Sequence, residues 1–267
     1  MIRPGPKGTY AAPAIEKAFE ILNMLSSHPD GALVSEMATY LDRSVGELFR
    51  IVIVLEQLGY LQKSAKSDRY TVAYQLLDLA YRATPAQNLV DAAMPEMRRL
   101  ALDTGQSCHL VVLNGAQGLV IAREENPGTR GFSLRLGATI DILRSCSGHV
   151  ILAFLAADRV DPVIAQAEAL QDAAIDRAML TERLATIRSR GFDRRTSPIT
   201  HGVTDISFPV FGFDGMAMGA LTIPFLELID GSQKVDFETG QTLLRGAADA
   251  ISATLGFNPQ RLSRQSS

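Results

Sequence analysis

The 267-residue sequence predicts an α+β chain with a small N-terminal domain and a larger C-terminal domain. Helical spacing of apolar residues runs through residues 13–58, and two short β-rich runs follow it. From residue 107 onward, pairs of β-rich runs alternate with amphipathic helices. The composition, with 46% apolar and 21% charged residues, is that of a folded globular protein.

Composition and charge narrow the function classes. The longest strictly apolar stretch, VILAFLAA, is far shorter than the roughly 20 residues of a membrane span. The N-terminus has no apolar signal core, so we expect a soluble cytoplasmic protein. Cys108 and Cys146 form neither a disulfide framework nor a zinc-finger spacing. Because the net charge is −3, any nucleic-acid contact depends on where the cations lie rather than on their sum.

Residues 13–74 predict a winged helix-turn-helix. Residues 13–27 form an amphipathic helix whose expected buried face is Ile15, Ala18, Phe19, Leu22 and Leu25. Ser35 is the expected N-cap of a short second helix, residues 42–44 a turn, and residues 60–72 a hairpin. A short helix that turns directly into a better-capped one is the helix-turn-helix unit, and its following helix is the one that enters a major groove.

The third helix, residues 44–61, has clear start and stop signals. Ser44 and Glu47 form a capping-box pattern, and Gly59 suits the left-handed end of the helix. The expected buried face is Val45, Leu48, Val52 and Leu55. The outward residues and the cations of the hairpin tip are of types that contact bases and phosphates. The candidate DNA-binding residues are Ser35, Arg43, Ser44, Gly46, Glu47, Arg50, Lys63, Lys66 and Arg69. The alternative is an ordinary surface helix, with Glu47 only a cap and the arginines solvated.

The C-terminal domain is expected to be an antiparallel sheet with flanking helices. The predicted order is a flexible arm 1–12, the DNA-binding domain 13–74, a linker helix 75–89, the larger domain 90–257 and a flexible tail 258–267. Within the larger domain we expect hairpins at 107–124 and 205–225 and a short strand at 132–137. Helices are expected at 147–158, 180–191 and 236–256.

This order of segments resembles the IclR family of bacterial transcriptional regulators. The phrases that carry the resemblance are AIEKAFEILNMLSS, VSEMATYL, VGELFRIVIVLEQLGYL, RYTV, SGHVILAFL and GVTDISFPVFGFDGMAMGALTI, which together span nearly the whole chain. The resemblance implies a winged helix-turn-helix, a linker helix and a GAF-like effector domain. It further implies operator DNA and a small metabolite, often a carboxylate or aromatic acid, as partners, and a homodimer or homotetramer without a cofactor or catalytic activity.

The resemblance also implies an effector cavity between the loop before residue 147 and the last hairpin. Its expected residues are Arg144, Ser145, Cys146, Ser147, Gly148, Asp205, Ser207, Thr222 and Pro224. Free N–H groups of Ser147 and Gly148 at a helix start favour a carboxylate, and Arg144 supplies a bidentate partner. In the alternative reading, Ser147 is only an N-cap and Arg144 is solvated. Two positions depart from the family, which often has Lys in the place of His149 and an acidic residue in the place of His201.

Two other function classes stay open from the residues alone. A metal- or redox-responsive regulator would use Cys146, His149, His201 and Asp205, which are transition-metal ligand types. An enzyme is the less favoured alternative because the sequence contains no G-x-S-x-G elbow and no phosphate loop. Cys108 and His109 are neighbours in a predicted strand, so their side chains point to opposite faces and cannot form a dyad.

Overall fold

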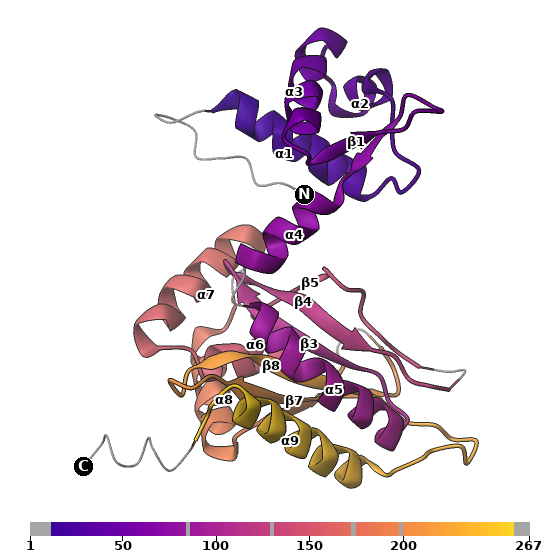
Figure 1. Ribbon diagram of the computed structural model, residues 1–267. Coiled ribbons are helices and arrows are strands. Elements are labelled where there is room, and N and C mark those ends of the chain that lie inside the picture. Colours follow the sequence, from indigo (N-terminus) through magenta and orange to yellow (C-terminus); the bar gives the residue numbers. More distant parts are fainter. Residues whose placement is uncertain (1–11, 84–85, 129–130, 172–174, 198–199, 259–267) are drawn as a thin grey trace. The chain divides into compact units, whose positions relative to one another are not determined.

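The computed structural model describes residues 12–83, 86–128, 131–171, 175–197 and 200–258 (Figure 1). The chain separates into two compact units, with the division between residues 84 and 85. This division lies within the segment predicted as the linker helix, and the predicted domain limits themselves stay predictions.

The N-terminal unit has the predicted order of three helices and a two-stranded hairpin. Its elements are α1 (Pro13–Ser26), α2 (Val34–Leu41), α3 (Val45–Gln57), β1 (Leu61–Lys63), β2 (Tyr70–Val72) and α4 (Tyr74–Ala83). The strands are antiparallel, with Leu61 opposite Val72. Ile21, Met37, Leu48 and Val52 are fully buried, so the core lies where α1, α2 and α3 meet.

Local signals place α3 as predicted. Asp42 ends α2 in the left-handed conformation, with φ of 52°, which makes the tight turn before α3. Ser44 is the N-cap, since its hydroxyl accepts a hydrogen bond from the N–H of Glu47 at 3.3 Å. Gly59 has a φ of 78°, a conformation that side chains other than glycine rarely adopt, and it ends the helix.

Three sequence predictions in this unit are wrong. Ile15 and Phe19 are exposed, because α1 is apolar on more than one side and turns Ile21 and Met24 inward together with the predicted Leu25. Val45 is also exposed. The N-cap of α2 is Leu33, whose N–H donates to the carboxylate of Glu36, so Ser35 lies inside the first turn.

The C-terminal unit is built on an antiparallel sheet of six strands in the order β5-β4-β3-β8-β7-β6, counted over the described residues. The strands are β3 (Cys108–Asn114), β4 (Gln117–Glu124), β5 (Thr139–Ile140), β6 (Asp193–Thr196), β7 (Val203–Phe211) and β8 (Ala217–Leu226). The helices are α5 (Ala86–Thr104), α6 (Cys146–Ala153), α7 (Ala157–Gln171), α8 (Arg177–Arg190) and α9 (Phe237–Thr254). The predicted hairpins β3–β4 and β7–β8 are confirmed.

Helices cover both faces of this sheet. α5 and α9 lie side by side on one face, where Leu100, Ile206 and Leu244 belong to one core (Figure 1). α6, α7 and α8 form a second core on the other face with Val111 and Ala220. Every residue of α6 is buried. The first turn of α6 is thereby fixed against the sheet.

The sequence missed some elements of the C-terminal unit. Residues 132–137 are not a strand; β5 follows them and has only two residues. α7, which contains Pro162, and the polar strand β6 were not predicted. None of the helices in the described ranges is long and apolar enough to cross a membrane.

Candidate functional site

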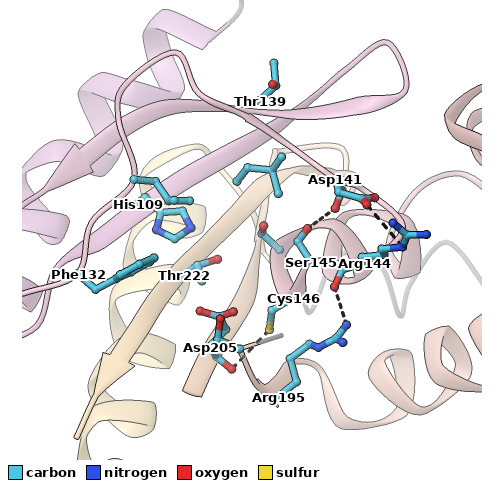
Figure 2. Close-up of a pocket in the computed structure, with 14 residues that line it drawn as sticks. His109, Phe132, Thr139, Asp141, Arg144, Ser145, Cys146, Arg195, Asp205 and Thr222 are labelled. Atoms are coloured by element: carbon cyan, nitrogen blue, oxygen red, sulfur yellow. Dashed lines mark hydrogen bonds and ion pairs between the residues drawn. The ribbon is translucent and has the colours of Figure 1, made fainter. Parts of the chain in front are cut away.

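A cavity of about 480 Å³ lies beside the first turn of α6 (Figure 2). Residues from the segment 132–141, the loop into α6 and the strands β3, β6, β7 and β8 line it. These residues are His109, Phe132, Leu134, Thr139, Ile140, Asp141, Arg144, Ser145, Cys146, Ser147, Arg195, Ser197, Asp205 and Thr222. Phe132, Leu134 and Ile140 are the large apolar residues of this lining, and most of the others carry polar side chains.

The loop before α6 is fixed by its own hydrogen bonds. Ser145 is the N-cap of α6: its hydroxyl accepts from the N–H of Gly148 at 3.0 Å and donates to the carbonyl of Asp141 at 2.6 Å. The carboxylate of Asp141 accepts from the N–H of Leu143 at 2.8 Å. The first residues of a helix have no helical carbonyl for their N–H groups. The first-turn amides of Cys146 and Ser147 therefore give this side of the cavity a partial positive charge.

Two arginines line the cavity next to this turn. Nη1 of Arg195 donates to the carbonyl oxygen of Arg144 at 2.7 Å, which ties β6 to the loop before α6. Arg144 itself is exposed, with Nε 3.9 Å from a carboxylate oxygen of Asp141 (Figure 2). The guanidinium of Arg195 adds positive charge on the α6 side of the cavity, whereas the charge of Arg144 is offset by Asp141.

Asp205 brings a carboxyl group to the same cavity from β7. Burial raises its pKa to about 6; Asp193 adds to this rise, and Arg195, which lies opposite Asp205 in the β6–β7 pairing, opposes it. Among the described residues its carboxylate forms no hydrogen bond. Beside it, burial holds the pKa of the Cys146 thiol well above the usual value. Cys146 is therefore a neutral thiol and a poor nucleophile.

His109 reaches the cavity from β3. Burial lowers the pKa of its imidazole to about 4, so the ring is neutral at pH 7. Its Nδ1 is buried and has no hydrogen-bond partner within the described residues. The neighbouring Cys108 lies in the core on the opposite face of the sheet, as the alternation of a strand requires.

His149 does not line the cavity, and both of its ring nitrogens have partners among the described residues. Nε2 lies 2.7 Å from the carbonyl of Leu143, and Nδ1 accepts from Nε of Arg183 at 3.0 Å. Arg183 in turn donates to Asp193 at 2.7 Å. Burial by itself raises the pKa of Asp193, but the contacts with His149 and Arg183 outweigh it and lower that pKa below its usual value. This network joins α6, α8 and β6.

Three predicted cavity positions, Gly148, Ser207 and Pro224, do not line the cavity. Gly148 does not line the cavity, and its N–H is bound to Ser145. A Cβ at Gly148 would lie 2.5 Å from the carbonyl oxygen of Ile142, so close packing requires the glycine. Ser207 is buried behind Thr222, with which it shares a hydrogen bond of 2.8 Å. Pro224 does not line the cavity either, whereas Arg144, Ser145, Cys146, Ser147, Asp205 and Thr222 do.

The metal alternative gains no support from the geometry. His149 turns to Arg183, and His201 is exposed. Within the part of the chain that the structure describes, no three His, Cys, Asp or Glu residues are placed to hold a metal ion.

The candidate DNA-binding residues all lie in the N-terminal unit, but several have partners there. Arg43 pairs with Glu20 at 3.3 Å, and Glu47 pairs with Lys17. Within the described residues, the exposed guanidinium of Arg50 has no ion pair or hydrogen bond. Gly46 presents bare backbone, with nothing within 4 Å of where a Cβ would lie.

The cations of the β1–β2 hairpin also differ in whether they have a partner within the N-terminal unit. Arg69 holds Glu36 at 2.7 and 2.9 Å and the carbonyl of Gly31 at 2.8 Å, so it fastens the hairpin to the rest of the unit. Lys63 pairs with Asp68 at 2.8 Å. The exposed ammonium of Lys66 has no such partner in the described ranges.

Eight of the fourteen lining residues were not predicted from the sequence. Phe132, Leu134 and Ile140 lie in a segment without strand or helix periodicity. Arg195 and Ser197 lie in or just after a polar strand, and only the register with β7 shows that Arg195 lies opposite Asp205. Asp141 could have been predicted from the sequence, because it lies three residues before Arg144 and its carboxylate accepts from a backbone N–H of the same loop.

Comparison with known families decides the identity of the chain. The family model for the C-terminal domain of bacterial IclR transcriptional regulators matches residues 81–253, and the IclR helix-turn-helix model matches residues 14–65. The chain belongs to the IclR family of bacterial transcriptional regulators. It is therefore a DNA-binding regulator of the IclR type, and its family is not one of enzymes.

Relatives of this IclR-type regulator match almost from end to end. The transcriptional regulator XynR of Escherichia coli is 21% identical over 91% of this chain and 97% of its own length. KdgR of the same organism is 23% identical over 92% and 93%. An IclR homolog from Microbacterium hydrocarbonoxydans, solved in complex with 4-hydroxybenzoate, aligns with a TM-score of 0.74 at 19% identity, over 91% of this chain and 98% of that one. At this identity the likeness shows the fold.

Proposed function

We propose that this regulator senses a small organic acid in the cavity beside α6 and changes its operator binding in response. The observation that carries the proposal is the junction of a helix N-terminus with Arg144 and Arg195 at one cavity of about 480 Å³. That volume is typical of small-molecule sites. A cytoplasmic location, where the operator is accessible, is part of the proposal.

The α6 side of the cavity suits a carboxylate. The amides of Cys146 and Ser147 supply donors and the helix dipole supplies partial charge, an arrangement that favours anions. Arg195 is held beside them by the carbonyl of Arg144, so its remaining nitrogens are positioned before a ligand arrives.

The apolar part of the cavity lining suits the body of the acid. Phe132, Leu134 and Ile140 offer apolar surface, and the aromatic ring of Phe132 favours a planar ligand. The relative from Microbacterium hydrocarbonoxydans was solved with 4-hydroxybenzoate, which is an acid of this kind. We therefore place an aromatic or similarly flat acid first among the candidate effectors.

Titration of the full-length protein with a panel of small organic acids tests this proposal by calorimetry and thermal shift. A ligand that binds only the folded state raises its apparent stability with concentration. Arg195→Gln should weaken the affinity for the acid that binds, whereas Arg159→Gln, an exposed arginine of α7 outside the cavity, should not. Failure of every acid to bind, or equal affinity in both variants, would refute the placement.

For the DNA-binding half we propose that α3 enters the major groove and that the β1–β2 hairpin contacts phosphate. Arg50 and Lys66 support it most directly, because their charges are exposed and have no partner in the described residues. For Arg43, Glu47, Lys63 and Arg69, contact with DNA requires exchange of an existing ion pair. Arg50→Ala and Lys66→Ala should each weaken operator binding in an anisotropy titration, and unchanged affinity in both would exclude this surface.

We also propose that the chain assembles into a homodimer or homotetramer. Ile15 and Phe19 of α1 and Tyr74 and Leu77 of α4 are large apolar side chains that the N-terminal unit leaves exposed. Contact with a second copy would remove this surface from water. Sedimentation of the full-length protein at micromolar concentration tests the assembly, and a monomer would contradict it.

A further inference from the structure

The outward face of α3 is unusually apolar for a helix that contacts DNA. Val45 is 50% exposed and Phe49 is 49% exposed. They are four residues apart, so they lie one above the other on the helix surface. Gly46, the residue after Val45, carries no side chain and has no neighbour within 4 Å of where a Cβ would lie. A partner can therefore approach the backbone closely at this point.

Most polar groups near the start of α3 are already engaged. The hydroxyl of Ser44 accepts the cap hydrogen bond from Glu47, and the carboxylate of Glu47 pairs with Lys17. Arg43, in the turn before the helix, pairs with Glu20. Among the charged side chains of α3 and this turn that the structure describes, Arg50 keeps its donors free.

Base edges in the major groove offer one apolar group, the C5-methyl of thymine, and apolar side chains read it by contact. Arginine reads guanine with two hydrogen bonds to O6 and N7. We propose that Val45 and Phe49 read thymine methyl groups in the operator and that Arg50 supplies the polar contact to a nearby guanine. The proposal rests on the proposed entry of α3 into the groove and goes beyond it by naming what is read.

The experiment starts from duplexes that the full-length protein selects from a random pool. Each thymine of a selected duplex is then replaced by deoxyuridine, which lacks only the methyl group, and the affinity is measured by anisotropy. At one or two thymines of each half-site the replacement should weaken binding by about fourfold, the factor that corresponds to one buried methyl group. Deoxyuridine at thymines in the flanks should have no effect.

Variants assign the effect to the two side chains. Val45→Ala and Phe49→Ala should each reduce the preference for thymine over uracil at one position. Leu58→Ala is the matched control: Leu58 is 60% exposed, but it lies at the C-terminal end of α3, thirteen residues after Val45, and so about 20 Å further along the helix axis. It should keep the wild-type preference. The uracil series uses the wild-type protein, so a variant that fails to fold does not remove the test.

Several results would overturn the proposal. Uracil tolerated at every position would do so, as would a uracil penalty that Phe49→Ala and Val45→Ala leave unchanged. A Phe49→Ala variant that sediments as a smaller species would assign this face to a second copy of the chain. Failure of α3 to enter the groove is a separate result, because Arg50→Ala would then leave the affinity for the selected duplex unchanged. A pool without enrichment would overturn both.

Discussion

Replacing Asp205 with Asn removes the one carboxylate that faces the proposed anion seat from β7. Burial raises the pKa of Asp205 from 3.8 to about 6, which is roughly two units. Each unit corresponds to about 1.4 kcal/mol between the two protonation states, so the ionised carboxylate costs the folded protein up to about 3 kcal/mol.

The direction of the pKa shift of Asp205 determines how the stability of the folded protein changes with pH. Because the folded-state pKa of Asp205 is the higher one, its contribution to stability is fully present below pH 3.8 and is lost as the pH rises to about 6. Asp205→Asn cannot ionise. The stability of the variant relative to wild type should therefore rise between pH 4 and pH 7 by up to about 3 kcal/mol and then stay constant.

Scanning calorimetry of both full-length proteins from pH 4.5 to 8 measures this difference. Asp249→Asn is the matched control, because Asp249 is exposed on α9. The ionisation of Asp205 also predicts how the affinity for an acid ligand depends on pH. Wild type should lose affinity above pH 6 by at most about tenfold per unit, because one proton is bound with the anion, and Asp205→Asn should not. A difference between Asp205→Asn and wild type that stays constant across this pH range would refute the reasoning.

Four further changes have expected outcomes. Burial lowers the pKa of His109 to about 4, so wild type loses stability as the pH falls from about 6.5 toward 4; His109→Gln should lessen this loss, by up to about 3 kcal/mol in calorimetry, and an equal acid sensitivity would contradict it. Ser145→Ala removes the α6 N-cap and should lower the free energy of unfolding by about 1 kcal/mol, whereas an unchanged denaturant midpoint would show that the cap is dispensable. Lys66→Ala should weaken all duplexes alike and reduce the slope of log affinity against log salt by about one; a sequence-dependent loss would instead indicate base contact. Leu77→Asp places a charge on a residue 63% exposed in α4 and should shift sedimentation toward monomer, and an unchanged assembly would move the interface elsewhere.

Local signals account for the parts of the fold that the sequence predicted. Ser44 and Gly59 mark the ends of α3 by capping chemistry that depends on a few neighbouring residues. The β7–β8 hairpin was predictable because turn residues, Asp214 and Gly215, separate two β-rich runs. Helix ends and tight turns can be predicted from the sequence because the interactions that form them involve residues only a few positions apart.

Contacts between elements that are distant in the sequence account for the predictions that were wrong. α1 has apolar residues on several sides, and which side is buried depends on α3, so the expectation for Phe19 was wrong. β6 is polar along its length and becomes a strand only because β7 pairs with it. Arg195 could not be predicted as a cavity residue for the same reason, because only the pairing of β6 with β7 places it opposite Asp205.

The register of the sheet also gathers polar residues that lie far apart in the chain. His109 lies opposite Thr222, Thr222 opposite Ser207, and Ser207 opposite Asp193, so one buried row crosses β3, β8, β7 and β6. Buried polar groups cost stability unless they are paired, and Nδ1 of His109 has no partner within the described residues. His109 and Thr222 line the cavity, whereas Asp193 contacts Arg183 of α8. A ligand that bonds to His109 would therefore offset this cost at one end of a row whose other end holds α8, which gives the cavity a physical connection to the helices behind it.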